Sequence, residues 1–334
     1  IDAHKKAILL KPDYAEAFDN MGVALKNQGK LDEALDAYKK AISLKSIRSK
    51  PYYNIGNIYR DQHKFDEAIL YYCKSISLKP NYIEAYNNMG LAFHYQDKSD
   101  EAIDAYNKAI SLKPDYAEAH HNLSFTLLNI GKIKEGLDES EWRWKTEKYF
   151  SKNRLFSKPM WDGIQSLKDR RILLWCEQGI GDTINWSSVA SLVSSQAAHC
   201  ILECQEKLVP LLKRSFPNVD VKPEDRSLDS ERDDFDFHLP MGSLYRHFLD
   251  KIIQNPNPAA YLIPDPVRVN FWRDRLNSLG KGPYVGIGWK SSNMSLERLP
   301  NYSSISEWFE ILSIPNVTFI NLQSKDFEDD LDKV

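Results

Sequence analysis

The chain has 334 residues, of which 42% are hydrophobic and 27% are charged, and its formal net charge is −3. These fractions are typical of an ordinary globular protein, and the length predicts two or three domains. A charge this close to zero gives no reason to expect nucleic acid as the main partner. The sequence holds no run of about 18 apolar residues, so we predict no membrane-spanning helix.

The four cysteines are Cys73, Cys176, Cys200 and Cys204, and no two of them form a C-x-x-C pair. Zinc sites usually need such paired ligands, so we expect no bound metal. Three of the cysteines lie in apolar, strand-like runs. We therefore predict reduced, buried thiols in a cytoplasmic protein.

From residue 13 the chain repeats with a period of 34 residues, in blocks that start at residues 13, 47, 81 and 115. Self-similarity at a fixed period is the signature of a repeat array. Prolines close three of the blocks. The recurring columns are asparagine (Asn20, Asn54, Asn88 and Asn122), a small residue (Gly22, Gly56, Gly90 and Ser124) and a second small residue (Ala34, Ala68, Ala102 and Gly136).

Each block predicts two amphipathic helices, for example residues 15–28 and 31–44, with the small residues placed where the helices cross closely. The pattern resembles the tetratricopeptide repeat (TPR), a solenoid in which stacked helical pairs bury each other's apolar faces. We expect an array over residues 1–148, with a partial repeat at 1–12 and complete repeats at 13–46, 47–80, 81–114 and 115–148. We therefore expect the chain to begin inside the solenoid.

The last block ends in an aromatic segment that starts at Glu141. Large aromatic residues at the end of a solenoid favour a capping helix packed on a following domain. We interpret Trp142, Trp144 and Trp161 as core between domains, and residues 151–167 as an irregular linker.

From residue 170 short apolar runs alternate with helical stretches, which predicts α/β layers with parallel sheets. We expect one such domain over residues 149–265 and the start of another over 266–334. The expected strands are 171–177, 199–203, 219–221, 235–239, 284–289 and 317–322, with helices at 183–196, 206–215, 267–279 and 305–312.

The segment Glu177-Gln-Gly-Ile-Gly-Asp182 follows the first expected strand. Its glycines permit a tight turn, and the helix that begins there favours anionic groups. Asp182 suits either a catalytic role or an ordinary helix cap. A nicotinamide fingerprint is a rival, because Gly179 and Gly181 fit G-x-G-x-x-G and Glu203 stands where a ribose-binding carboxylate would; Ile184 occupies the third glycine position.

A second loop follows the strand expected at 284–289. It carries Lys290 and Arg298, which could neutralise a diphosphate or could be ordinary surface cations.

Residues 142–322 resemble the glycosyltransferase-like domain that follows TPR arrays in many bacterial proteins, a relative of the lipopolysaccharide heptosyltransferases (glycosyltransferase family 9). The resemblance implies a GT-B architecture, with two Rossmann-like domains facing a cleft, and inverting, metal-independent sugar transfer without a cofactor. The residues that carry it are Glu141-Trp-Arg-Trp, Pro159-Met-Trp-Asp-Gly, Ile172-Leu-Leu-Trp-Cys-Glu-Gln-Gly-Ile-Gly-Asp-Thr-Ile, Phe237-His-Leu-Pro-Met-Gly-Ser-Leu, Tyr261-Leu and Val285-Gly-Ile-Gly-Trp.

The resemblance also implies roles for individual residues. Asp182 matches the general base, and Gln178 and His238 would line the acceptor side of the cleft; a structural role is also open for His238. Family members continue beyond the point where this chain stops, so we expect the second Rossmann-like domain to be incomplete. The resemblance further implies that the donor diphosphate is bound by Gly179, Gly181, Lys290, Ser291 and Arg298.

Two further patterns have alternative interpretations. Asp234 and Asp236 imitate a D-x-D metal motif, and we interpret them as strand-edge carboxylates. The asparagine column lies on the first helix of each repeat, where amides could hold the backbone of a bound peptide or could bond helix to helix. The sequence therefore predicts a glycosyltransferase-like protein whose TPR arm binds a protein or peptide. The alternative is a non-catalytic TPR scaffold with a degenerate transferase domain.

Overall fold

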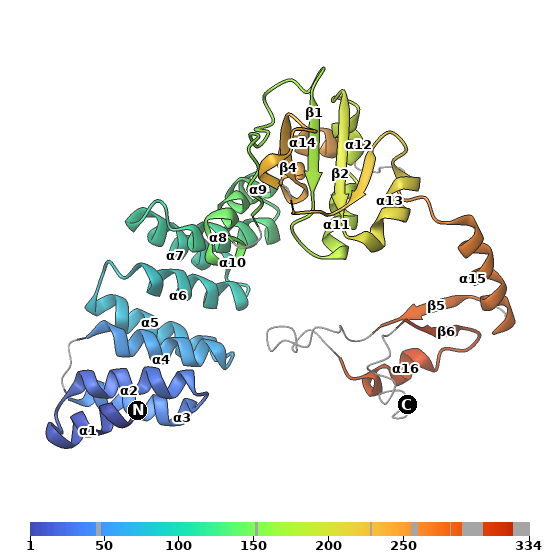
Figure 1. Ribbon diagram of the computed structural model, residues 1–334. Coiled ribbons are helices and arrows are strands. Elements are labelled where there is room, and N and C mark those ends of the chain that lie inside the picture. Colours follow the sequence, from blue (N-terminus) through green and yellow to red (C-terminus); the bar gives the residue numbers. More distant parts are fainter. Residues whose placement is uncertain are drawn as a thin grey trace. The chain divides into compact units, whose positions relative to one another are not determined.

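The computed structural model describes residues 1–44, 48–150, 153–227, 229–254, 260–280, 282–288 and 303–322. The chain divides into two compact units. The first combines Ile1–Val209 with Phe216–Ala259, and the second combines Pro210–Ser215 with Ala260–Val334. Each unit is taken by itself below (Figure 1).

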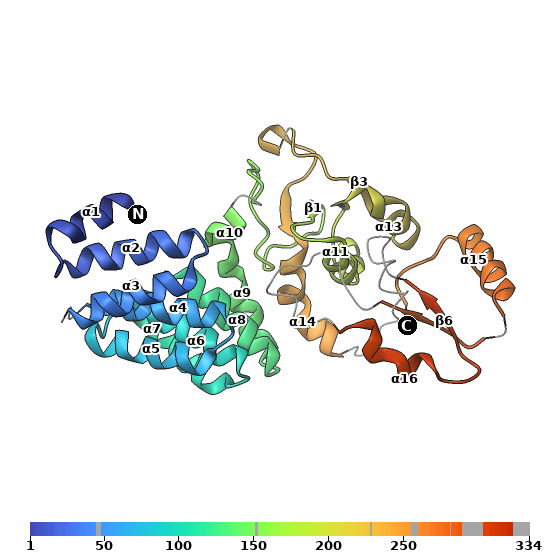
Figure 2. The same cartoon turned by 90° about the horizontal axis from the view of Figure 1, so that it is seen from below.

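The first unit begins with helices that follow one another in antiparallel pairs, as Figures 1 and 2 show. The observed bounds agree with the predicted helices to within one or two residues where bounds were predicted. The helices are α1 (Asp2–Leu10), α2 (Ala15–Asn27), α3 (Leu31–Ser43), α4 (Ser49–Asp61), α5 (Phe65–Leu78), α6 (Ile83–Tyr95), α7 (Ser99–Leu112), α8 (Ala117–Asn129) and α9 (Ile133–Ser140).

The first small-residue column has a partner that the sequence did not reveal. A Cβ atom added to Gly56 would lie 2.7 Å from the ring of Tyr72, and Gly22 and Gly90 meet their own tyrosines in the same way. The tyrosine column (Tyr38, Tyr72 and Tyr106) is fully buried. In the fourth repeat the equivalent tyrosine position holds Ser140, and there the small-residue column can hold Ser124. Each glycine therefore makes room for one aromatic ring.

The turn between the two helices of each repeat contains one residue with left-handed backbone. The φ angle of this residue lies between 58° and 78°. In chain order, the residues of the four repeats are Gly29, His63, Asp97 and Gly131. Only glycine adopts this conformation without strain, so the middle two repeats keep a small local cost.

The array ends in the 3-10 helix η1 (Glu141–Lys145) and the short helix α10 (Glu147–Phe150). Trp142 stacks on His120 of α8, with ring centroids 3.9 Å apart, so it packs within the array. The ring centroids of Trp144 and Trp175, which is on the first strand, lie 5.5 Å apart. Trp144 therefore joins the helical array to the α/β part, as expected. Trp161 is buried against Phe248, inside the α/β part.

The rest of the first unit is built on a four-stranded parallel sheet in the order β3-β2-β1-β4. The order reverses at β1, which has β2 on one side and β4 on the other. Ile172 to Trp175 of β1 are completely buried, as a parallel strand covered on both faces should be. The strands are β1 (Arg171–Trp175), β2 (His199–Cys204), β3 (Asp220–Pro223) and β4 (Phe237–Pro240).

Helices connect these strands, and one predicted helix differs. In place of a helix over 183–196 there are α11 (Ile180–Ser187) and α12 (Ala190–Ser194). The hydroxyls of Ser187 and Ser188 donate to backbone carbonyls three residues earlier, and such bonds weaken a helix interior. The remaining helices of this unit are α14 (Leu244–Gln254) and the 3-10 helices η2 (Glu206–Leu208), η3 (Asp229–Glu231) and η4 (Met241–Ser243). From Pro210 onward, α13 (Val209–Ser215) belongs to the second unit.

The second unit contains a two-stranded parallel sheet and a small hydrophobic core, in which Ile287 and Ile305 are buried. Helix α15 begins after Asp265, whose carboxylate accepts the N–H groups of Val267 and Arg268. The GT-B architecture stays a prediction. The described elements are α15 (Pro266–Ser278), β5 (Tyr284–Ile287), η6 (Ile305–Trp308), α16 (Phe309–Leu312) and β6 (Thr318–Asn321).

All four cysteines are free thiols. Cys176, Cys200 and Cys204 are buried in or beside β1 and β2, as predicted. Cys73 is exposed on α5, so the expectation of burial is wrong for this residue. Its Sγ lies 3.8 Å from Met89 Sδ of α6, so the next repeat covers it only in part.

Candidate functional site

The loop after β1 leaves the sheet at its carboxyl edge, beside the end of β4 and therefore at the reversal of strand order. Ligands of open α/β sheets bind at such reversal points. Gly179 is the N-cap of α11, and the exposed Asp182 lies in its first turn. Asp182 Oδ2 accepts the Gly179 N–H at 3.3 Å. Asp182 is thus a capping carboxylate that still faces solvent.

The other predicted residues of this loop have defined surroundings. The Gln178 carbonyl accepts a hydrogen bond from Gln205 Nε2 at 2.8 Å, which fixes the backbone just before the glycines. A Cβ atom added to Gly181 would meet nothing within 4 Å. The surface at Gly181 is therefore open, and a ligand could approach the backbone there.

At the root of the loop stands Glu177, which is 5% exposed and contacts Arg143 of η1. Arg143 donates from Nε and Nη2 to Glu177 Oε1, at 3.0 and 2.8 Å. It also donates from Nη2 to Ser243 Oγ at 2.9 Å, and from Nη1 to Glu141 Oε1 at 2.7 Å. Arg143 therefore links the end of the helical array to the loops that follow β1 and β4.

Burial raises the pKa of Glu177 to about 7, against the opposing charge of Arg143. Burial also raises the pKa of Tyr149 in α10, and the charges of Glu177 and Asp182 add to that rise.

Glu203, the carboxylate of the nicotinamide alternative, is 2% exposed at the end of β2. Its two oxygens accept from Arg154 Nη1 and Arg232 Nη1, both at 2.5 Å. Arg154 comes from the segment predicted as an irregular linker. A ribose could reach Glu203 only by displacing both guanidinium groups, which argues against dinucleotide binding.

His238 lies within β4 and is 6% exposed. Its Nδ1 accepts from Trp175 Nε1 at 3.3 Å, and its ring centroid lies 4.6 Å from that of Phe156. Burial, helped by the charge of Arg154, lowers the pKa of His238 to about 4. The histidine is therefore neutral and surrounded by aromatic rings, which fits the structural role left open for it.

The carboxylates of the D-x-D-like pair lie at the start of β4 and bond to arginines. Asp234 accepts two hydrogen bonds from Arg232, both at 2.9 Å. Asp236 accepts the Arg171 N–H at 2.8 Å and its Nη2 at 3.2 Å. Both act as strand-edge carboxylates, and the arginine bonds lower the pKa of Asp234 while the backbone N–H of Arg171 does so for Asp236.

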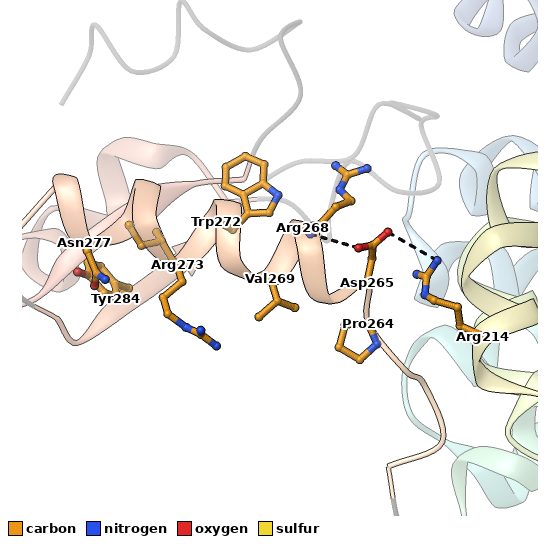
Figure 3. A pocket seen from close by; sticks show the side chains of 10 residues that line it. Arg214, Pro264, Asp265, Arg268, Val269, Trp272, Arg273, Asn277 and Tyr284 are labelled. Carbon is orange, nitrogen blue, oxygen red and sulfur yellow. Dashed lines mark hydrogen bonds and ion pairs between the residues drawn. The ribbon is translucent and has the colours of Figure 1, made fainter.

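Lys290, Ser291 and Arg298 lie outside the described residues. In the second unit the structure shows an open pocket of about 630 Å³ along α15 (Figure 3). Arg214 approaches Asp265 there, with a nitrogen–oxygen distance of 4.0 Å, and its Nε donates to the Ile263 carbonyl. Trp272 and Arg273 project from different sides of the helix (Figure 3).

The predicted asparagine column lies on the first helix of each repeat, and three of its members bond to the preceding repeat. These amides form a polar ladder between helices, so their nitrogens are already in use. The donor–acceptor pairs are Asn54 Nδ2 to Asp19 Oδ1 (3.3 Å), Asn88 Nδ2 to Tyr53 Oη (3.0 Å) and Asn57 Oδ1 (2.9 Å), and Asn122 Nδ2 to Asn87 Oδ1 (3.0 Å).

Asn20 stands at the other end of the column. It lines a pocket of about 440 Å³ together with Glu16, Arg48, Lys50 and Lys79. Glu16 is paired with Arg48 at 3.1 Å. Lys50 also lines it, with Asp19, and Lys79 Nζ lies 4.4 Å from the centre of the Tyr82 ring.

Among the described residues, no helix is long and apolar enough to cross a membrane.

The chain was compared with known proteins. It is 30% identical over 220 residues to protein FlbA of Caulobacter vibrioides (strain ATCC 19089 / CIP 103742 / CB 15), which covers 61% of this chain and 37% of FlbA. The chain thus spans little more than a third of that relative. A crystal structure of MamA shares 25% identity, covering 46% of this chain and 89% of MamA with a TM-score of 0.41. YrrB, described as a TPR protein with an unusual peptide-binding site, shares 23% identity over 44% of this chain and 75% of YrrB, with a TM-score of 0.39.

Family profiles match the helical array itself. Profiles described as tetratricopeptide repeat match residues 15–46, 83–116 and 105–138, and one described as TPR repeat matches 56–97. These matches coincide with α2 to α9 and with the 34-residue period. The N-terminal helical array of this protein consists of tetratricopeptide repeats.

Proposed function

We propose that this is a cytoplasmic glycosyltransferase-like protein, in which the α/β part transfers a sugar from a nucleotide donor and the TPR array binds a protein or peptide partner. The observation that carries the proposal is the exposed Asp182, placed at the first turn of α11 beside the strand-order reversal. The free thiols suit a reducing compartment. The proposed division is an array at 1–148, a first α/β domain at 149–265 and a second from 266.

In this proposal Asp182 removes the proton from an acceptor hydroxyl as its oxygen attacks the anomeric carbon of the donor sugar. The configuration inverts, and the nucleoside diphosphate leaves. Gly179 and the backbone N–H of Gly181, with Lys290, Ser291 and Arg298, contact the departing diphosphate and stabilise its charge. Gln178 borders the acceptor side, whereas the buried His238 keeps the structural role described above.

Two features support this assignment over dehydrogenase chemistry. Glu203 is saturated by two arginines, which removes the carboxylate that a ribose would need. The glycine loop also lacks the third glycine, because Ile184 stands there. The sequence resemblance to GT-B transferases also includes the residues on both sides of this loop.

The test uses the full-length protein and a panel of UDP-, GDP-, ADP- and CMP-linked sugars. Thermal stabilisation and donor hydrolysis are measured for the wild type and for Asp182→Asn. Asparagine caps a helix as well as aspartate does, so the variant should fold. We expect one donor to stabilise both proteins, and hydrolysis to fall about 10²- to 10⁴-fold in the variant. Stabilisation by NAD and by no nucleotide sugar would contradict the assignment.

The alternative is a TPR scaffold whose α/β part is non-catalytic, and the relatively open pocket at Asn20 favours a binding role for the array in either case. A peptide selected on the wild-type protein from a random display library provides the probe. Asn20→Ala should weaken its binding without lowering the melting temperature, because the described ladder bonds do not include Asn20. Peptide binding with no response to any donor would favour the scaffold.

A further inference from the structure

One side chain from the end of the helical array bonds to both loops that leave the sheet at its reversal point. Arg143 is 4% exposed, and its guanidinium donates to Glu177 after β1 and to Ser243 after β4. Ser243 in turn donates to Glu141 Oε1 at 2.8 Å, which closes a four-member network. Such planar, multidentate contacts fix the orientation of their partners.

We propose that Arg143 is a positioning residue for the Gly179–Asp182 loop, so that the TPR array supplies part of the geometry of the α/β site. The inference rests on the proposed function for its role in catalysis. The physical claim about the loop stands on the contacts alone. A transferase domain separated from η1 would lose this support.

The path from Arg143 to the loop is short. Glu177 is two residues from Gly179, and its carboxylate packs against Gly242. A Cβ atom added to Gly242 would lie 2.4 Å from Glu177 Oε1, the oxygen that Arg143 also bonds. Arg143 and the close approach of Gly242 together hold this oxygen, and we expect a change at the guanidinium to shift the backbone at 177–179.

Lysine cannot replace this arginine. An ammonium group offers three donors around one point and cannot span Glu177, Ser243 and Glu141 with the fork geometry of a guanidinium. Losing the contact leaves a buried carboxylate without its counter-charge. A displacement of about 1 Å at a reacting group is enough to lower a rate about 100-fold.

The first experiment measures hydrogen exchange in the full chain without ligand. The reporter is the Thr183 amide, which donates to the Gly179 carbonyl at 3.0 Å and so reads the first turn of α11. We expect Arg143→Lys to speed its exchange at least tenfold. The control is Arg246→Ala, which removes an exposed ion pair with Asp138 at the same junction and should leave Thr183 unchanged.

A second variant keeps the test valid if Arg143→Lys unfolds. Arg143→Met combined with Glu177→Gln removes both fully buried charges and leaves only Glu141, which is 20% exposed, without its counter-charge. Faster exchange at Thr183 in this folded double variant supports the proposal. Unchanged exchange at Thr183 in either folded variant would overturn it.

The second experiment uses the donor sugar found in the panel above. Arg143→Lys should lower kcat at least tenfold with little change in KM, because the donor contacts themselves remain. An unchanged kcat would contradict the catalytic part of the inference. If the wild type hydrolyses no donor, the proposed function fails, and the exchange of Thr183 still decides whether Arg143 positions the loop.

Discussion

The two parts of the first unit hold their buried polar groups in different ways. Within the TPR array they are mostly neutral, as in the ladder that Asn88 makes with Tyr53 and Asn57. Within the α/β part and where the array meets it they are charged, as in the pair of arginines on Glu203 and in Arg143 with Glu177. A neutral hydrogen bond contributes about 1 kcal/mol, whereas an unpaired buried charge costs several.

The difference also concerns distance along the chain. Ladder partners stand about one repeat apart, 35 residues for Asn54 and Asp19, so each repeat supplies what its neighbour needs. The ion clusters join distant segments, 100 residues in the case of Arg143 and Ser243. We infer that the array tolerates loss of one polar residue, whereas the α/β part depends on a few individual charges.

The largest expected effect is at the charged cluster on β2. Glu203→Ala removes the carboxylate shared by the buried Arg154 and the half-buried Arg232, which keep Asp229 and Asp234 as partners. We expect the free energy of unfolding to fall by about 3 kcal/mol, the low end for a broken buried ion pair. The matched control is Glu224→Ala, which breaks a surface pair with Arg226 and should cost less than about 1 kcal/mol. Chemical denaturation measures both. Equal losses in the two variants would contradict the contrast.

Inside the array the largest effect should come from sterics. A methyl group on Gly56 would meet the ring of Tyr72, which cannot withdraw because its hydroxyl donates to Asn57 at 2.8 Å. We expect Gly56→Ala to lower stability by about 1–3 kcal/mol, despite the better helix propensity of alanine. Gly181→Ala, which meets open space in α11, should instead be neutral or slightly stabilising. A Gly56→Ala protein as stable as the wild type would show that the ring can move.

Sequence reasoning succeeded where the signal is local. The period of 34 residues located the helices, and continuous apolar runs located β1 and β2, because both patterns depend on neighbours within one element. The position of Asp182 after β1 followed for the same reason. The domain boundaries and the roles of Asp182, Lys290, Ser291 and Arg298 stay predictions.

What sequence reasoning missed depends on segments that meet only in the folded chain. Nothing near Glu203 in the sequence indicates that Arg154, 49 residues away, occupies its carboxylate. The tyrosines that pack on the glycine column also recur every 34 residues, at Tyr38, Tyr72 and Tyr106. In the fourth repeat serines replace both members of the pair, Ser140 for the tyrosine and Ser124 for the glycine. This joint replacement could have indicated the contact. Arg143 gave no comparable signal, because it occurs once.

The charged interior should also make stability depend on pH. Burial raises the pKa of Glu177 in the folded protein to about 7 from its ordinary value of 4.5. The stability that the protonated side chain contributes is therefore fully present below about pH 4.5 and is lost as pH rises to about 7. In that window Glu177 should lower the unfolding free energy by up to about 1.4 kcal/mol per pH unit. Glu177→Gln should flatten this slope, and Asn88→Ala, a change in the neutral ladder, should not. Denaturation at several pH values between 4 and 8 measures it.

The smallest effect concerns backbone strain, and it should change sign between two repeats. Asp97 and Gly131 occupy the same turn position with φ of 58° and 78°, and Asp97 is exposed. Asp97→Gly relieves the left-handed strain of a residue with a Cβ atom, so we expect a gain of about 0.5–1 kcal/mol, reduced by the entropy of a more flexible unfolded chain. Gly131→Ala should lose about 1–2 kcal/mol at the equivalent turn, since a Cβ atom there would meet nothing within 4 Å and only the backbone resists it. Thermal melting of both variants measures the pair. A gain in stability for Asp97→Gly and a loss for Gly131→Ala would show that the two repeats share one turn geometry. A loss of stability in both variants would instead mean that the Asp97 carboxylate stabilises its turn by more than the backbone strain costs.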